Sequence, residues 1–167
     1  MPDCFRFLNK KYMGREIEYK YLVNKKLWPK VTAVNRVMIK QAYLHCGTDI
    51  SIRIRIKEDG GFITIKGKAE GPVRPEFEYE IPLEDANDLL THFSSPIIEK
   101  IRHYVSCEHK TWEVDEYLGL NAGLITAEIE LSDINEKYSL PFWIEKDITG
   151  DFRYSNASLS LRPFTTW

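Results

Sequence analysis

The feature that most constrains this chain is the strict alternation of residues 50–57, which read ISIRIRIK. Isoleucine fills every second position, and the positions between hold Ser51, Arg53, Arg55 and Lys57. Successive side chains of a β-strand point to opposite faces, and β-branched residues favour strands. The stretch therefore predicts a strand with one aliphatic face and one largely basic face.

Other runs show the same two-faced pattern. Glu16, Glu18 and Lys20 alternate with Ile17 and Tyr19, which puts two carboxylates and an ammonium in one row at a spacing of about 7 Å. Such a row is either a set of solvated surface charges or a group that a divalent cation bridges. We predict further strands over residues 36–45, 62–68, 76–81, 97–105, 111–118 and 124–131.

The polar faces of these strands carry charges in blocks of one sign. The acidic residues on them are Glu16, Glu18, Glu76, Glu78, Glu80, Glu113, Asp115, Glu128 and Glu130. The basic residues are Lys20, Arg53, Arg55, Lys57, Lys66, Lys68, Arg74, Lys100 and Arg102. Because strands that are close in sequence tend to pair, we expect basic and acidic rows to lie side by side.

The segments between the strands predict turns and helices. Gly60 and Gly61 are expected to supply positive φ angles in a hairpin turn after residue 57. Helical spacing of apolar residues predicts an amphipathic helix over 84–93, and we expect a short helix over 132–137 and a closing helix over 150–161. No linker divides the chain, so we predict a single domain over residues 14–167, with residues 1–13 as an N-terminal extension before it.

Composition argues against several classes of protein. The chain has 167 residues, a net charge of −2 and a pI of about 6.1, so no excess of positive charge indicates a nucleic-acid partner. No apolar run is long enough to cross a bilayer, so we expect no membrane partner. The three cysteines, Cys4, Cys46 and Cys107, lack metal-site spacing, which predicts reduced thiols and a cytoplasmic location.

Two architectures satisfy these patterns. In the first, the apolar faces pack inward as a sandwich and the charges are solvated. In the second, the sheet closes into a barrel with a charged lumen, and the apolar outer face is covered by helices. An arginine can donate two hydrogen bonds to the oxygens of one phosphate group, and carboxylates bind Mg²⁺ or Mn²⁺. A lumen that contains arginines and carboxylates would therefore suit a polyphosphate bridged by a metal. The patterns alone leave both architectures open.

A set of ordered motifs resembles a known family. The motifs are EIEYKYLV at 16–23, RIR at 53–55, ITIKG at 63–67, EFEYEIP at 76–82, KIR at 100–102, WEVD at 112–115, NAGL at 121–124, AEIEL at 127–131 and GDFRYSNASL at 150–159. Their order and spacing resemble the triphosphate tunnel metalloenzymes, also called the CYTH domain family, and in particular its short, stand-alone bacterial branch. The resemblance runs from about Gly14 to Leu159.

The resemblance implies a fold and an activity. The implied fold is an α+β, mainly β protein, in which an eight-stranded antiparallel closed barrel forms a tunnel with a charged lumen and helices pack on the outside. The implied activity is divalent-metal-dependent hydrolysis of a triphosphate, most simply inorganic tripolyphosphate to pyrophosphate and phosphate, with Mg²⁺ or Mn²⁺ as cofactor. The alternatives on the same fold are an adenylate cyclase, a thiamine triphosphatase or a non-catalytic polyphosphate-binding module.

The resemblance also assigns roles to residues. The implied metal ligands are Glu16, Glu18 and Glu130, with Glu128, Glu78 and Asp115 as candidates for a second metal. The implied phosphate ligands are Lys20, Arg53, Arg55, Lys66, Lys100 and Arg102. Glu16, Glu18, Lys20, Asp115 and Tyr154 form the implied catalytic set. The expected partner is a small polyphosphate or nucleoside triphosphate, and the expected assembly is a monomer or homodimer.

Overall fold

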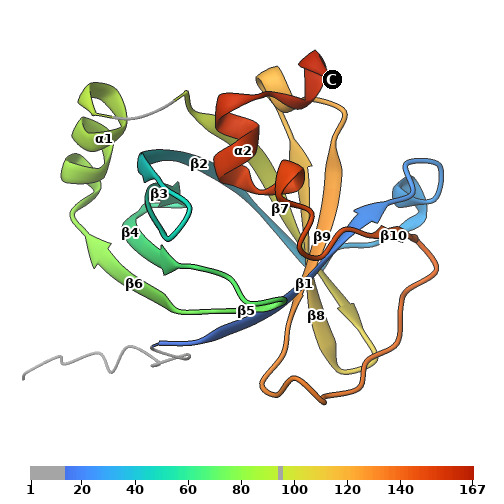
Figure 1. Cartoon of the computed structure of the whole chain (residues 1–167). Helices are drawn as coiled ribbons and strands as arrows, with labels where there is room; N and C mark the ends of the chain where they lie inside the picture. Colours follow the sequence, from blue (N-terminus) through green and yellow to red (C-terminus); the bar gives the residue numbers. More distant parts are fainter. Residues whose placement is uncertain (1–13, 94–95) are drawn as a thin grey trace, which may run out of the picture.

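The protein folds as one antiparallel β-sheet with a few short helices. The computed structural model describes residues 14–93 and 96–167, and Figure 1 shows its elements in order. The strands are β1 (Glu16–Val23), β2 (Asn35–Cys46), β3 (Ile50–Lys57), β4 (Gly60–Gly67), β5 (Val73–Arg74), β6 (Glu76–Ile81), β7 (Ile98–Cys107), β8 (Lys110–Tyr117), β9 (Ile125–Glu130) and β10 (Ile144–Asp147). The α-helices are α1 (Leu83–His92) and α2 (Asn156–Leu161), and 3₁₀ turns cover Trp28–Lys30, Gly119–Asn121, Phe152–Tyr154 and Phe164–Thr166.

The sheet curls into a nearly closed barrel. Its strand order is β10-β1-β9-β8-β7-β2-β3-β4-β6, and β5 pairs with β1. The Gly14 N–H donates to the Glu76 carbonyl oxygen at 3.1 Å, so the start of β1 meets the start of β6. The predicted antiparallel barrel is confirmed, with ten strands in place of eight. The two additional strands are short, and both pair with β1.

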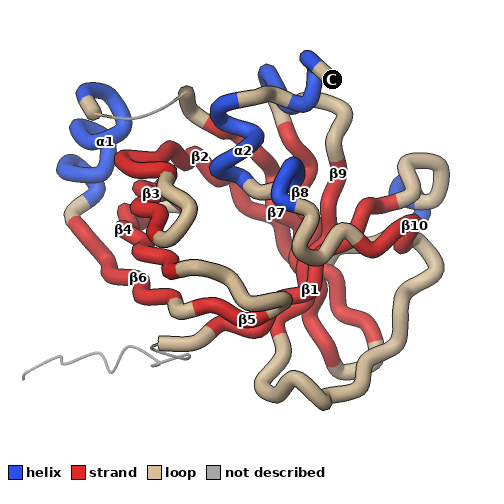
Figure 2. The backbone as a smooth tube through the Cα atoms, viewed as in Figure 1, coloured by secondary structure: helices blue, strands red, loops and turns tan. Residues whose placement is uncertain are grey.

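The apolar faces of the strands point away from the barrel axis and are covered there. On one side, α1 packs Ala86 and Leu90 against Ala42 of β2 and Ile54 of β3. On the other side, the long loop between β9 and β10, drawn in tan in Figure 2, brings partly buried Tyr138 and buried Trp143 against a cluster that includes Trp112. The structure therefore has the second of the two architectures, the barrel with a charged lumen, because the charged faces are left to line its interior.

The contact between α1 and the barrel leaves no room beneath the helix. A Cβ atom on Gly61 would lie 2.6 Å from the Ala86 Cβ and 3.1 Å from the Ile81 carbonyl oxygen. Replacing Gly61 with alanine should therefore push α1 off the sheet and lower the free energy of unfolding by roughly 1–3 kcal/mol. Urea denaturation measures this loss, and a variant as stable as the wild type would contradict the close packing.

One end of the lumen is filled by apolar side chains. Ile98 lies on the same face of β7 as Lys100, and Tyr117 lies on the same face of β8 as Asp115. Both pack with Leu124 and with Leu159 of α2 into a buried cluster. The helix thus closes this end of the barrel. It is shorter than predicted, because Ser155 interrupts the helical segment and caps α2 by accepting a hydrogen bond from the Ser158 N–H at 3.1 Å.

Two local predictions were wrong. The positive φ in the turn after β3 falls on Glu58, at 54°, whereas Gly60 and Gly61 belong to β4. Residues 132–137 form a turn in place of a helix, and the Glu136 carboxylate accepts a hydrogen bond from the Ser132 N–H at 2.8 Å. The predicted extension over residues 1–13 lies outside the described residues. Among the helices of the described segments, none has the length and apolar character needed to cross a membrane.

Candidate active site in the barrel lumen

The lumen contains a cavity of about 840 Å³ whose wall is built from charged side chains of both signs. This volume lies within the range of roughly 300–1,000 Å³ that small-molecule sites occupy. Carboxylates and cations from β1, β3, β4, β6, β7, β8 and β9 reach the wall, and residues around the start of α2 complete it. The predicted site residues on the wall are Glu16, Glu18, Lys20, Arg53, Arg55, Lys66, Glu78, Arg102, Glu128 and Glu130.

The acidic side of the cavity is formed where β1 and β9 pair. Glu18 lies opposite Glu130 and Lys20 lies opposite Glu128, because the two strands run antiparallel in this register. The Lys20 ammonium donates to the Glu128 carboxylate at 2.7 Å, and both side chains are buried. Burial by itself would lower the pKa of Lys20. The adjacent Glu128 carboxylate acts in the opposite direction, and the pKa of Lys20 is raised above its usual range. Lys20 is therefore a cation that is already paired.

Glu16 is held by two cations. Its carboxylate accepts from Arg74 Nε at 2.6 Å and from Lys66 Nζ at 3.1 Å. Burial alone would raise the pKa of Glu16, but Lys66, a hydrogen bond with Glu76 and Arg74 together hold it well below its usual range. Glu16 is thus an anion with strong partners on the cavity wall.

Glu18 differs from Glu16 because negative charge exceeds positive charge around it. Burial and the carboxylates of Glu128 and Glu16 raise the pKa of Glu18 to about 8, and Arg74 only partly opposes them. The guanidinium of Arg74 reaches Glu18 with an Nη2–Oε1 distance of 3.6 Å. At neutral pH this carboxyl group holds a proton, and a bound cation is the other way to neutralise it.

The basic side of the cavity is formed by β3 and β4, where acidic residues of β6 act as partners. Arg55 Nη2 donates to the Glu78 carboxylate at 2.5 Å, and Arg53 Nη2 donates to Thr64 Oγ1 at 3.1 Å. The buried Nε atoms of Arg53 and Arg55 have no hydrogen-bond partner among the described residues. Two guanidinium groups with donors to spare are suited to phosphate oxygens, which accept several hydrogen bonds each.

Lys100 and Asp115 lie behind the wall. Asp115 is fully buried, and its two oxygens accept from Lys100 Nζ at 2.5 Å and from Arg102 Nε at 2.7 Å. Arg102 continues to the cavity, where its Nη2 donates to Glu128 at 2.9 Å. Burial lowers the pKa of Lys100 to about 8 although Asp115 opposes the shift. Asp115 is therefore placed as the counterion of two buried cations, and Lys100 does not line the cavity.

Tyr154 also lies away from the wall. Its ring contacts that of Trp167 at a centroid distance of 5.1 Å, and it packs against the apolar cluster at the closed end. Its position follows from the interrupted C-terminal helix, since Tyr154 ends the 3₁₀ turn that precedes Ser155. The structure does not bring this predicted catalytic residue to the cavity.

Several charged residues that the sequence did not assign to the site do line the cavity. Lys57 and Glu76 extend the alternating rows of β3 and β6, so the period-two pattern could have included them. Lys57 Nζ donates to the Tyr104 hydroxyl at 2.7 Å. Arg74 has no such signal, because it lies on a two-residue strand between prolines and reaches the wall only through the pairing of β5 with β1.

The acidic side of the lumen has the donor chemistry for a hard divalent cation, which binds oxygen ligands. Glu16, Glu18 and Glu130 supply three carboxylates, and the raised pKa of Glu18 indicates a local excess of negative charge that a cation would relieve. Within residues 14–93 and 96–167, no three acidic, imidazole or thiol side chains already converge as a metal site. The three carboxylates are therefore chemically suited to bind a divalent metal. Their side chains would have to move closer together to bind it.

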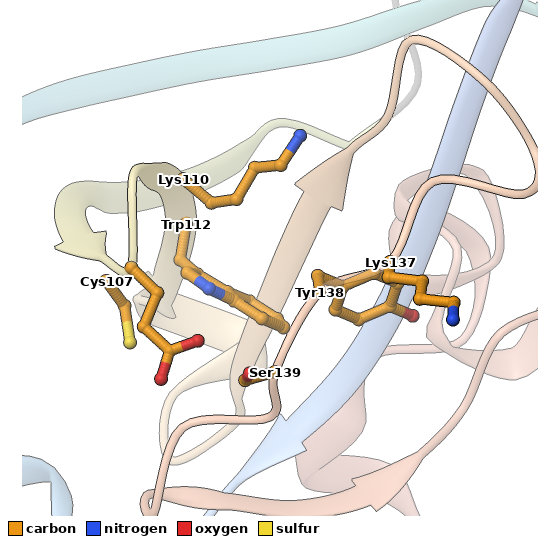
Figure 3. A pocket seen from close by; sticks show the side chains of 7 residues that line it. Cys107, Lys110, Trp112, Lys137, Tyr138 and Ser139 are labelled. Carbon is orange, nitrogen blue, oxygen red and sulfur yellow. The ribbon is translucent and has the colours of Figure 1, made fainter.

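A second, smaller cavity lies outside the barrel. It has a volume of about 370 Å³, and Figure 3 shows it beside the indole of Trp112, with Cys107, Tyr138 and Ser139 around it. Lys110, which forms an ion pair with Glu136, lies at its edge. This cavity lacks the carboxylate and guanidinium rows of the lumen, so we place the candidate active site in the lumen.

Comparison with known proteins gives results that agree with this geometry. The family model described as the CYTH domain matches residues 14–164. A protein of Acetivibrio thermocellus called inorganic triphosphatase is 42% identical over 153 residues, which are 91% of this chain and 97% of that protein. A solved inorganic triphosphatase has a TM-score of 0.64 at 27% identity and covers 87% of this chain and 94% of its own. A putative adenylate cyclase of Bacillus halodurans shares the fold, with a TM-score of 0.60 at 18% identity over 72% of this chain and 83% of its own.

Proposed function

We propose, because this chain belongs to the CYTH domain family, that it hydrolyses inorganic tripolyphosphate to pyrophosphate and phosphate with Mg²⁺ or Mn²⁺ bound in the barrel lumen. The observation that carries the proposal is the two-signed wall of the 840 Å³ cavity, where carboxylates of β1 and β9 face guanidinium groups of β3. The 42% identity to an inorganic triphosphatase supports triphosphate hydrolysis as the reaction.

The cations of the wall would bind the substrate. Arg53, Arg55, Lys66 and Arg102 are fixed by carboxylates or hydroxyl groups around them, so their donors are held in place before substrate enters. Preorganised donors stabilise charge that develops in the transition state without a further cost of reorganisation. We propose Lys20 as a further phosphate ligand beside Glu128, and we assign it no role as a base because its pKa is raised.

The acids would hold the metal. Glu16, Glu18 and Glu130 are the proposed ligands, and Glu128 and Glu78, which also line the cavity, are the candidates for a second cation. A divalent metal bound there would withdraw charge from the phosphate oxygens and position water for in-line attack. Asp115 and Tyr154 are left out of the proposed catalytic set because they lie away from the cavity. We further propose one domain over residues 14–167, a cytoplasmic location, and a monomeric or homodimeric state.

The direct test is release of phosphate from tripolyphosphate by the full chain. We expect turnover with Mg²⁺ or Mn²⁺ and its loss in excess chelator, because the carboxylates of the lumen are suited to hold the cation. ATP and thiamine triphosphate are assayed in parallel, and the products from ATP are separated to detect cyclic AMP. Turnover that chelator leaves unchanged would reject the metal, and exclusive use of a nucleotide or of thiamine triphosphate would reject tripolyphosphate as the substrate.

A further inference from the structure

Arg74 lies where the proposed metal ligands converge. Its strand β5 has two residues and pairs with the start of β1 (Figure 1). In this pairing Arg74 lies directly opposite Glu16. The backbone of this segment is fastened to β1, because the Glu18 N–H donates to the Pro72 carbonyl oxygen at 3.0 Å. The side chain is 28% exposed and lines the cavity. A fixed backbone thus carries a long, flexible cation into the acidic side of the lumen.

The guanidinium of Arg74 spans two carboxylates. Its Nε lies 2.6 Å from Glu16 Oε2, and its Nη2 lies 3.6 Å from Glu18 Oε1. Lys66 also contacts Glu16, at 3.1 Å, but it is shared with Glu76 at 2.8 Å, so it belongs to the next row of the wall. Among the described residues, Arg74 is therefore a cation that contacts both Glu16 and Glu18.

We infer that Arg74 is a built-in competitor of the metal, which holds Glu16 and Glu18 until a divalent cation displaces it and which then turns to the phosphate chain of the substrate. This inference rests on the proposed metal requirement. A divalent cation and a guanidinium cannot share the same carboxylate oxygens without strong repulsion, because both are positive and the site is partly shielded from water. The displaced side chain remains on the cavity wall, where the substrate would lie.

The same exchange accounts for the arrangement of the acids. Within the described residues no three potential ligands converge, and Glu16 is turned toward Arg74 and Lys66. Release of Arg74 removes the shorter of the two hydrogen bonds to Glu16 Oε2 and the guanidinium that reaches Glu18, while Lys66 stays in contact with Glu16. Metal binding and triphosphate binding are then coupled through one side chain, and such coupling must act in both directions.

The test measures Mn²⁺ affinity in the absence of substrate, by electron paramagnetic resonance of free Mn²⁺, for the wild type and for Arg74→Gln. We expect Arg74→Gln to bind Mn²⁺ about 5-fold or more tightly, the lower end of usual coupling effects. At saturating Mn²⁺ the same variant should show a higher KM for tripolyphosphate, because a phosphate ligand is lost. Opposite changes in the two affinities are the expected signature, since a residue that merely supports the fold would weaken both.

Two variants serve as controls. Arg15→Gln removes the same charge from an exposed position that also lines the cavity, and its Mn²⁺ affinity should change by less than about 2-fold because solvent screens the charge. Arg74→Lys keeps the positive charge, so its Mn²⁺ affinity and its KM for tripolyphosphate should be closer to those of the wild type than the values for Arg74→Gln. Unchanged or weaker Mn²⁺ binding in Arg74→Gln, or no detectable binding in either protein, would overturn the inference. If Mn²⁺ binds as expected but tripolyphosphate is not hydrolysed, the proposed function fails and the competition remains.

Discussion

Replacing Glu18 with glutamine should reduce metal-dependent hydrolysis of tripolyphosphate by about 100-fold or more, since even residues that support metal ligands contribute 10–100-fold. Glu18 lies opposite Glu130 on the acidic wall, and the amide keeps its shape but cannot ionise to bind a cation. Phosphate release at saturating Mg²⁺ measures the effect. A variant that retains more than about a tenth of the activity would remove Glu18 from the metal site.

The same variant should fold normally, which makes the loss of activity interpretable. Because burial and neighbouring carboxylates raise the pKa of Glu18 to about 8, the folded protein already holds this group neutral at pH 7. A neutral amide avoids the cost of taking up a proton on folding, so urea denaturation at pH 7 should give a free energy of unfolding at least equal to that of the wild type. Glu80→Gln is the matched control, because Glu80 shares a strand face with Glu78 but does not line the cavity.

Replacing Asp115 with alanine should instead lower the free energy of unfolding by about 3–5 kcal/mol, the usual result of removing one partner of a buried ion pair. Asp115 and Lys100 are 0% and 1% exposed, and Asp115 also pairs with Arg102. Without the carboxylate, two cations stay buried with less compensation. Denaturation in urea, followed by circular dichroism, measures the loss.

A double variant separates this structural role from a catalytic one. Replacing Lys100 with methionine together with Asp115→Leu removes both charges, so it should be less destabilised than the sum of the single variants. Glu116→Ala, on the opposite face of β8, should cost less than about 1 kcal/mol, because the Glu116 side chain is 43% exposed and keeps access to water beside its contact with His103. A loss below 1 kcal/mol for Asp115→Ala would contradict the placement of Asp115 as a buried counterion.

Local patterns in the sequence predicted most strands and the membership of the cavity wall. The alternation over 50–57 matches β3 at both ends, and the acidic run beginning at Glu16 matches the start of β1. This works because the strand period of two depends only on neighbouring residues. The same period brings Arg53, Arg55, Glu128 and Glu130 to one lumen once the barrel closes. The charge patterns left both the barrel and the sandwich open. The motifs that resemble the CYTH family favoured the barrel.

Tertiary structure decided which of the charged residues are accessible. Lys100 and Arg102 share a face of β7 and look equivalent in the sequence. In the structure, Lys100 lies next to the apolar cluster at the closed end of the barrel and does not line the cavity, whereas Arg102 does. Arg74 reaches Glu16 through contact between segments 58 residues apart. The sequence by itself determined the strands, the sign of each polar face and the family. Only the closed barrel decided which charges pair with one another and which face the lumen, because those contacts depend on strand register and on the segments that fill the barrel ends.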